Sequence, residues 1–310
     1  MPAGKVGEGR IAGGIFALAA IASLILGAII GLLVEAAGSW ASAFAVFDAY
    51  LLRVARFTLW QALLSTLLSV VPAIFVARAL ARHPAFPGRT FILRLFALPL
   101  ALPAIVVALG VLALYGRAGY FADLLTLAAG ERWQGIYGLS GILVAHVFFN
   151  LPLATRLFLG ALESIPSGQW RLAAQLGMNA QASFRFIECP VLRSAVPGVA
   201  GLVFMLCATS FAIVLMLGGG PRATTLEVAI YQALRFDFDP ARAVSLTLVQ
   251  VMLTAAIVVF LGRLGASMTG DASLPEVVQA VNAAELTLQT VTAVRDRLIN
   301  AYQELMRTQM

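Results

Sequence analysis

The segment RLAAQLG at residues 171–177, followed nine residues later by IECP at residues 187–190, is the most informative part of this sequence. It predicts a short helix, a glycine turn and a second helix. Gly177 permits a sharp backbone turn, and the small side chains of Ala173 and Ala174 permit close approach of another surface. Pro190 is expected to end the second helix. The segment therefore predicts a projection that docks onto another protein.

Long apolar runs extend outward from this segment in both directions. A transmembrane helix needs about 20 apolar residues, and the sequence contains six such runs. They cover residues 11–34, 57–77, 95–116, 133–155, 194–221 and 243–262. The first run is longer than the apolar core of about 7–15 residues in a signal peptide, so we interpret it as a retained span. The predicted fold is an all-α membrane protein with six transmembrane helices in a domain at 11–264.

The composition excludes a water-soluble globule. Of 310 residues, 61% are hydrophobic and 12% are charged, against about 25% charged residues in soluble domains. Mean hydropathy is +0.92. The net charge of +6 does not indicate a nucleic-acid partner, because the cations are arginines scattered between apolar runs, apart from Lys5. Two cysteines, with no nearby histidine at metal-ligand spacing, indicate neither a disulfide framework nor a metal site.

The distribution of cations predicts the orientation in the membrane. Residues 1–10 and the loops 78–94 and 156–193 are rich in positive charge, and they alternate with loops that hold most of the acidic residues. Cationic loops stay on the cytoplasmic side, so both termini are expected there. The cations on this side are Lys5, Arg10, Arg78, Arg82, Arg89, Arg94, Arg156, Arg171, Arg185 and Arg193.

Candidate pathway residues lie in the fourth run. No Asp or Glu occurs inside any run, and His146, with Phe149 and Asn150 close by, is the ionisable residue within a span. Ionisable and aromatic groups in a membrane interior are typical of a substrate pathway. The alternative is that these side chains form hydrogen bonds and packing contacts between helices.

The loop at 156–193 resembles the EAA loop of ABC importer permeases, whose pattern is E-A-A-x-x-x-G, nine residues, then I-x-L-P. Ala173, Gly177, Ile187 and Pro190 match the pattern. Arg171, Leu172 and Cys189 replace its Glu, first Ala and Leu. The resemblance implies that Arg171, Leu172, Ala173, Ala174, Gly177, Ile187 and Pro190 belong to a coupling loop. Such a loop enters a cleft of a cytoplasmic ATPase subunit and transmits nucleotide-driven closure to the spans.

Longer passages are similar to the first half of thiamine transporter permeases. They cover residues 50–80, 145–153, 172–178 and 217–243. This resemblance implies an inner-membrane permease for thiamine, a periplasmic thiamine-binding protein, and a second permease half to which nothing in this sequence corresponds. The chain has no P-loop, because Lys5 is its lone lysine. We therefore expect a non-enzyme that binds no cofactor, with ATP held by the partner subunit.

A polar linker at 265–274 precedes an amphipathic helix predicted at 275–310. Apolar residues recur at alternating spacings of four and three, which favours packing against a partner helix. A solvated amphipathic tail is the alternative. The seam contains Val281, Leu288, Val291, Leu298, Tyr302 and Leu305.

The tail resembles the C-terminal end of the flagellar hook-basal body protein FliE. The likeness rests on VRDR at 294–297 and AYQELMRTQM at 301–310. It implies packing against proteins of the flagellar rod and MS ring. Two alternative interpretations follow: a basal-body structural component carried on a membrane anchor, or a fusion of the two families.

Overall fold

The computed structural model describes residues 49–220 and 223–268, together with isolated positions between residues 16 and 34. Regular structure in these ranges is helical. The described helices are α3 (Ala49–Arg82), α4 (Arg89–Leu95), α5 (Leu98–Ala101), α6 (Ala104–Tyr115), α7 (Ala122–Ala129), α8 (Leu139–Glu163), α9 (Ser167–Gln175), α10 (Ala180–Ser183), a π-helical turn (Phe184–Glu188), α11 (Cys189–Ala208), α12 (Phe211–Leu217), α13 (Leu226–Arg235) and α14 (Pro240–Met268).

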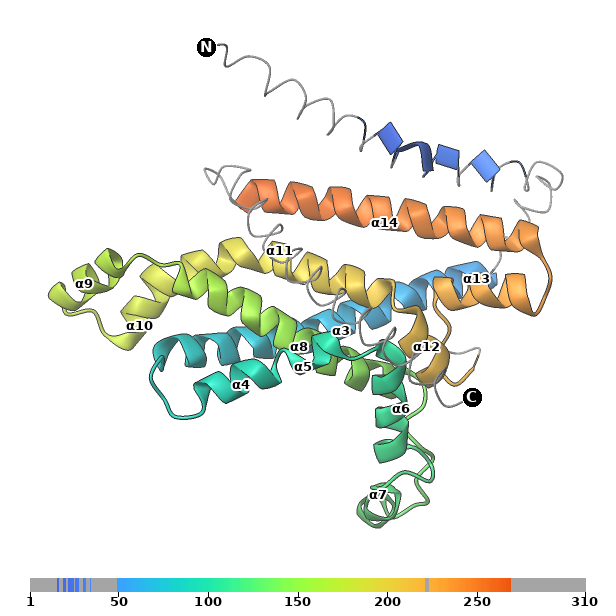
Figure 1. Cartoon of the computed structure of the whole chain (residues 1–310), viewed down its shortest axis with the longest axis horizontal. Helices are drawn as coiled ribbons and strands as arrows, with labels where there is room; N and C mark the ends of the chain where they lie inside the picture. Colours follow the sequence, from blue (N-terminus) through green and yellow to red (C-terminus); the bar gives the residue numbers. More distant parts are fainter. Residues whose placement is uncertain are drawn as a thin grey trace, which may run out of the picture.

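Three long helices, α3, α8 and α11, pack against one another at the centre, and α14 packs on α11 and α13. In Figure 1, α9 and α10 lie together at one end of the long axis, and α12 and α13 lie toward the other. Buried alanines on α3 and α8, such as Ala62, Ala73 and Ala154, have no exposed surface. Small residues let helix backbones approach closely. The result is a packed framework from which α9 and α10 project.

Among the described residues, four helices are long and apolar enough to cross a membrane: Ala49–Arg82, Leu139–Glu163, Ala180–Ala208 and Pro240–Phe260. They confirm helices at the runs 57–77, 133–155 and 243–262, and at most of 194–221. The run 11–34 lies outside the described residues apart from isolated positions. The predicted tail helix at 275–310, with its whole seam, lies outside them entirely.

The third run, 95–116, is not the single straight helix that its composition predicts. Helices α4 and α5 meet α6 at a bend of 106°. Leu102 at the bend is extended, with φ −84° and ψ 134°, and Pro103 follows it. Proline has no N–H to donate and pushes the preceding residue out of helical geometry. The described spans therefore number four, or five if this bent pair crosses as one.

The fifth run, 194–221, also departs from expectation. Its helix ends at Ala208, and the chain continues into α12 after Thr209 and Ser210. The Ser210 hydroxyl donates to the Cys207 carbonyl, 3.2 Å away. A side chain that bonds nearby backbone in this way competes with the regular helical pattern. The run consequently contains a helix that is broken at Thr209 and Ser210.

Candidate functional site

The part of the structure that contains the predicted coupling residues, here called the coupling segment (residues 167–190), has the expected order of helix, glycine turn and helix. Helix α9 ends at Gln175, and Gly177 takes the left-handed conformation at φ +63°. The amide of Met178 donates to the Ala173 carbonyl at 3.0 Å, which closes the end of α9. The Asn179 carboxamide oxygen then accepts the Ala182 amide at 2.8 Å and caps α10.

Pro190 does not end the second helix, contrary to the prediction. It occupies the first turn of α11, and the helical path runs from Ala180 to Ala208. The π-helical turn at 184–188 precedes it, and the Cys189 amide donates to the Phe184 carbonyl five residues back. The wider turn changes the backbone hydrogen-bonding pattern immediately before Pro190, which has no N–H to donate. The helix therefore continues past Pro190.

The two faces of α9 have different roles. Ala173 is 5% exposed and packs in the same buried cluster as Leu162 and Ile187. Arg171 and Ala174 are exposed. Ala173 therefore permits close packing within this chain, and Ala174 is the alanine that remains accessible to a partner. Among the other predicted coupling residues, Leu172, Gly177 and Pro190 are exposed and Ile187 is buried.

Three large apolar side chains on this projection are exposed, and two of them, Leu176 and Phe186, were not among the predicted coupling residues. Leu172 is 56% exposed, Leu176 is 69% exposed and Phe186 is 64% exposed. Exposed apolar side chains of this size are candidates for contact with a partner when they lie together on one surface. The signal was present in the sequence, since these apolar residues interrupt the polar connection between two spans.

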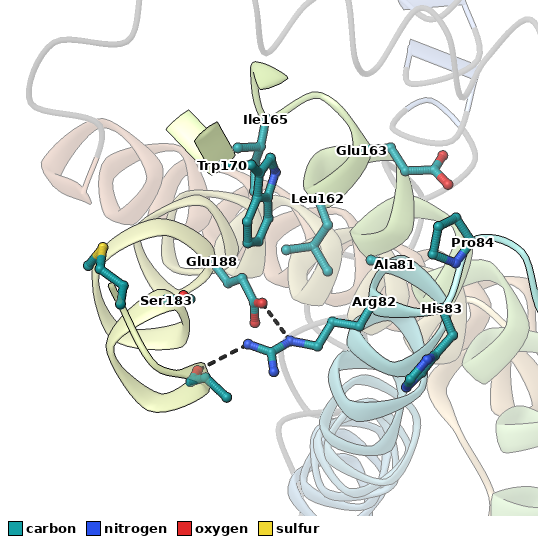
Figure 2. Close-up of a pocket in the computed structure, with 12 residues that line it drawn as sticks. Ala81, Arg82, His83, Pro84, Leu162, Glu163, Ile165, Trp170, Ser183 and Glu188 are labelled. Carbon is teal, nitrogen blue, oxygen red and sulfur yellow. Dashed lines mark hydrogen bonds and ion pairs between the residues drawn. The ribbon is translucent and has the colours of Figure 1, made fainter. Parts of the chain in front are cut away.

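A pocket of about 700 Å³ lies between this projection and the ends of α3 and α8. Figure 2 shows Trp170 and Leu162 on one side and Arg82 with Glu188 across from them. The lining residues are Ala81, Arg82, His83, Pro84, Leu162, Glu163, Ile165, Trp170, Met178, Ala180, Ser183 and Glu188.

An ion triad fastens the coupling segment to α3, and the sequence analysis did not predict it. The Glu188 side chain is 2% exposed; it accepts hydrogen bonds from Arg78 Nε at 2.6 Å and from Arg82 Nε at 2.8 Å. Arg82 Nη2 also donates to the Ala180 carbonyl at 3.1 Å. Arg78 and Arg82 are four residues apart and therefore lie on one face of α3, and this spacing was the part of the triad that the sequence indicated. Nothing in the sequence indicated that Glu188 is their partner.

The predicted pathway residues form part of a buried polar network. His146 Nδ1 lies 2.8 Å from the Ser65 hydroxyl, and Nε2 lies 2.6 Å from the Ser210 hydroxyl. Asn150 Nδ2 donates to the His146 carbonyl at 2.9 Å and to Cys207 Sγ at 3.3 Å. These contacts join α3, α8 and the break after α11. In this conformation they match the alternative of interhelical hydrogen bonding.

Phe149 is half-buried beside this network. Its ring meets Phe148 edge-on, with centroids 5.8 Å apart. Gln61 Oε1 and Ser69 Oγ are buried and have no hydrogen-bond partner among the described residues. A pathway role for His146, Phe149 and Asn150 stays a prediction.

Comparison with known proteins agrees with this architecture. The chain is 60% identical over 255 residues to the thiamine transport system permease protein ThiP of Brucella abortus, covering 82% of this chain and 47% of that protein. The ThiP of Salmonella typhimurium is 50% identical over 265 residues, or 85% and 49% of the two chains. The chain thus spans about half the length of these relatives.

Solved structures show the same fold. A bacterial ABC transporter involved in the import of the acidic polysaccharide alginate matches with a TM-score of 0.67 and 14% identity, covering 85% of this chain and 98% of the other. The MetNI methionine ABC transporter, in an inward-facing conformation, matches with a TM-score of 0.55 and 17% identity, covering 71% and 96%.

Two family models match different parts of the chain. Residues 264–310 match the flagellar hook-basal body complex protein FliE. Residues 69–269 match the binding-protein-dependent transport system inner membrane component, which covers more than half of the chain. The packed helices, the projecting coupling segment and these similarities show that the chain belongs to the family of binding-protein-dependent transport system inner membrane components, the permeases of ABC importers.

Proposed function

We propose that this chain is one permease half of an ABC importer for thiamine. The projecting helix α9 carries the proposal, because its inner face is anchored by Ala173 and its outer face exposes Arg171, Leu172 and Ala174. A helix that is packed on one face and accessible on the other can be displaced by a docked partner and can transmit that displacement to the helices packed against it. The choice of thiamine rests on the similarity to ThiP proteins.

The proposed assembly divides its tasks among several chains. A cytoplasmic ATPase subunit binds ATP and docks on the coupling segment, and this chain binds no cofactor and is not an enzyme. A periplasmic thiamine-binding protein delivers the substrate, and a second permease half completes the pathway. The chain lies in the inner membrane with both termini in the cytoplasm. The arginines at the α9 end support this orientation, because Arg82 donates to Ala180 of the coupling segment and Arg89 pairs with Glu163 at the end of α8, shortly before that segment.

Uptake into proteoliposomes tests this function. Vesicles contain the chain, the ATPase, a separately produced second half, and the thiamine-binding protein on the outside, with ATP enclosed. We expect ATP-dependent accumulation of labelled thiamine, and none when the ATPase is omitted. Accumulation of an unrelated vitamin in place of thiamine would refute the substrate, and absence of any coupling to ATP would refute the function.

The match to FliE over residues 264–310 favours a second function for the tail. We propose that residues 275–310 pack against rod or MS-ring proteins of the flagellar basal body through the seam of Val281, Leu288, Val291, Leu298, Tyr302 and Leu305. A pull-down of the isolated rod and ring proteins with the full chain tests it. Retention of these proteins by the full chain supports the proposal, and equal retention by a chain lacking the tail refutes it.

A further inference from the structure

We propose that Glu188, held by Arg78 and Arg82, is a positioning residue that makes the coupling segment and α3 move as one body. This inference rests on the proposed function, in which an ATPase pushes on α9. It concerns the transmission of that push inside the membrane domain and not the docking surface itself. Figure 2 shows Arg82 between Glu188 and the backbone of α10.

The two arginines of the triad contact the coupling segment at several separate points. Each carboxylate oxygen of Glu188 accepts one bond, from Arg78 Nε at 2.6 Å and from Arg82 Nε at 2.8 Å. Arg82 continues to the Ala180 carbonyl at 3.1 Å, and the Arg78 guanidinium lies 4.2 Å from the centroid of the Phe184 ring. The two arginines therefore hold the π-helical turn at its beginning, at its end and at the helix before it.

The cost of burying Glu188 argues against simple stabilisation. A buried ion pair adds little net stability compared with apolar side chains of similar volume, because the charges lose their hydration. Glu188 is almost fully buried, whereas the side chains of Arg78 and Arg82 are 29% and 30% exposed. What a charged pair provides and an apolar contact does not is a fixed angle and distance between two elements.

The triad lies at a part of the chain where bending would otherwise absorb a displacement of α9. Between α9 and α11 lie the turn at Gly177, the four-residue α10 and the π-helical turn at 184–188. Such interruptions are local points of bending. By fastening Glu188 and Ala180 to α3, the triad bypasses these points and connects the projection directly to the longest described helix.

The test compares Glu188→Gln with two further variants in the reconstituted importer. Glu188→Gln keeps the shape and removes the charge, and Glu188→Asp keeps the charge. Glu163→Gln is the matched control, because the ion pair of Glu163 with Arg89 lies at the same end of the molecule but joins α8 to α4 and not to the coupling segment. Measured quantities are ATPase bound per chain, ATP hydrolysed, and thiamine transported per ATP.

We expect Glu188→Gln to retain the ATPase while the thiamine-to-ATP ratio falls by roughly 10-fold to 150-fold, since losing a hydrogen bond to a charged group changes an equilibrium by about that factor. Glu188→Asp should recover much of the ratio, and Glu163→Gln should match wild type. Arg82→Gln serves as a second variant if Glu188→Gln does not insert, because Arg82 is partly solvated. It should show the same uncoupling.

The outcomes separate the inference from the function on which it rests. If the wild-type chain shows no ATP-dependent uptake, the proposed function fails, and this inference fails with it. If the wild-type chain transports thiamine and both Glu188→Gln and Arg82→Gln keep its ratio, only the positioning role is overturned. An equal loss in Glu163→Gln would also overturn it, because the effect would then belong to any ion pair at this end.

Discussion

Replacing Gly177 by Trp tests whether the turn after α9 enters a partner. Gly177 has a φ of +63° and is exposed, and a Cβ atom built at this position meets no heavy atom within 4 Å. The first atom of a side chain at this position therefore has open space among the described residues. If the coupling segment docks as proposed, the tryptophan side chain would lie where the wall of the ATPase cleft must lie.

The expected magnitude has two parts. A residue other than glycine in the left-handed conformation costs roughly 1–2 kcal/mol, and this cost is the same for Ala and for Trp. Overpacking of a close-fitting interface costs about 1–3 kcal/mol more, and it applies to Trp alone. That second part corresponds to a loss of roughly 5-fold to 150-fold in affinity for the ATPase.

The assay measures the Kd of the purified ATPase for the chain in lipid nanodiscs. Gly177→Ala is the control, since it carries the backbone strain without the bulk. We expect Gly177→Ala to bind nearly as well as wild type and Gly177→Trp to bind much more weakly. Equal binding by all three chains would remove this turn from the interface. Equal weakening in both variants would assign the effect to backbone strain and refute the argument from bulk.

Four other predictions concern the interior, the assembly and the tail. Ser65→Ala should destabilise the chain by about 1–3 kcal/mol, because it removes the partner of His146 Nδ1, and thermal inactivation in detergent measures the change. Vesicles with the chain, ATPase and binding protein should accumulate no thiamine until a second permease half is added. Deleting residues 271–310 should leave membrane insertion and ATPase docking unchanged, as protease protection and co-purification would show. Replacing Leu298 and Leu305 by Asp should abolish retention of flagellar proteins in the pull-down.

Composition and apolar run length were sufficient to predict the class of fold. Runs such as 57–77 and 133–155 are helices because lipid excludes water from the backbone, and a helix satisfies its own N–H and C=O groups. The pattern of residues 171–177 also predicted the helix and the glycine turn that follow from it. These predictions depend on local sequence and on the solvent, and both can be read along the chain.

Proline signals were harder to interpret because their effect depends on the neighbouring turns. Pro103 breaks the third run, and the extended Leu102 before it is the ordinary consequence. Pro190 has the opposite outcome, since the π-helical turn upstream lets the helix pass through it. The same residue type thus ends one helix and continues another. The difference lies in backbone hydrogen bonding that the sequence does not display.

The Glu188 triad could not be predicted because it is a long-range contact. Glu188 and Arg78 are 110 positions apart in sequence, and their meeting depends on how α3 and α11 pack. A single sequence contains no signal for such a pair beyond the presence of opposite charges. The two faces of α9 were equally hidden, since Ala173 and Ala174 are identical in type and differ only in the direction that the fold gives them.

The orientation of α9 also bears on the replacement of the family's usual Glu by Arg171. Arg171 lies on the exposed face, and its guanidinium donates to the Ser167 hydroxyl at 3.2 Å within the same helix. It is therefore not committed to the packed core. A charge at an exposed rim acts mainly on association rate and on the choice of partner. If this segment docks as proposed, we expect the ATPase surface to accept a cation at this point and to meet Leu172, Leu176 and Phe186 through apolar contacts that do not depend on charge.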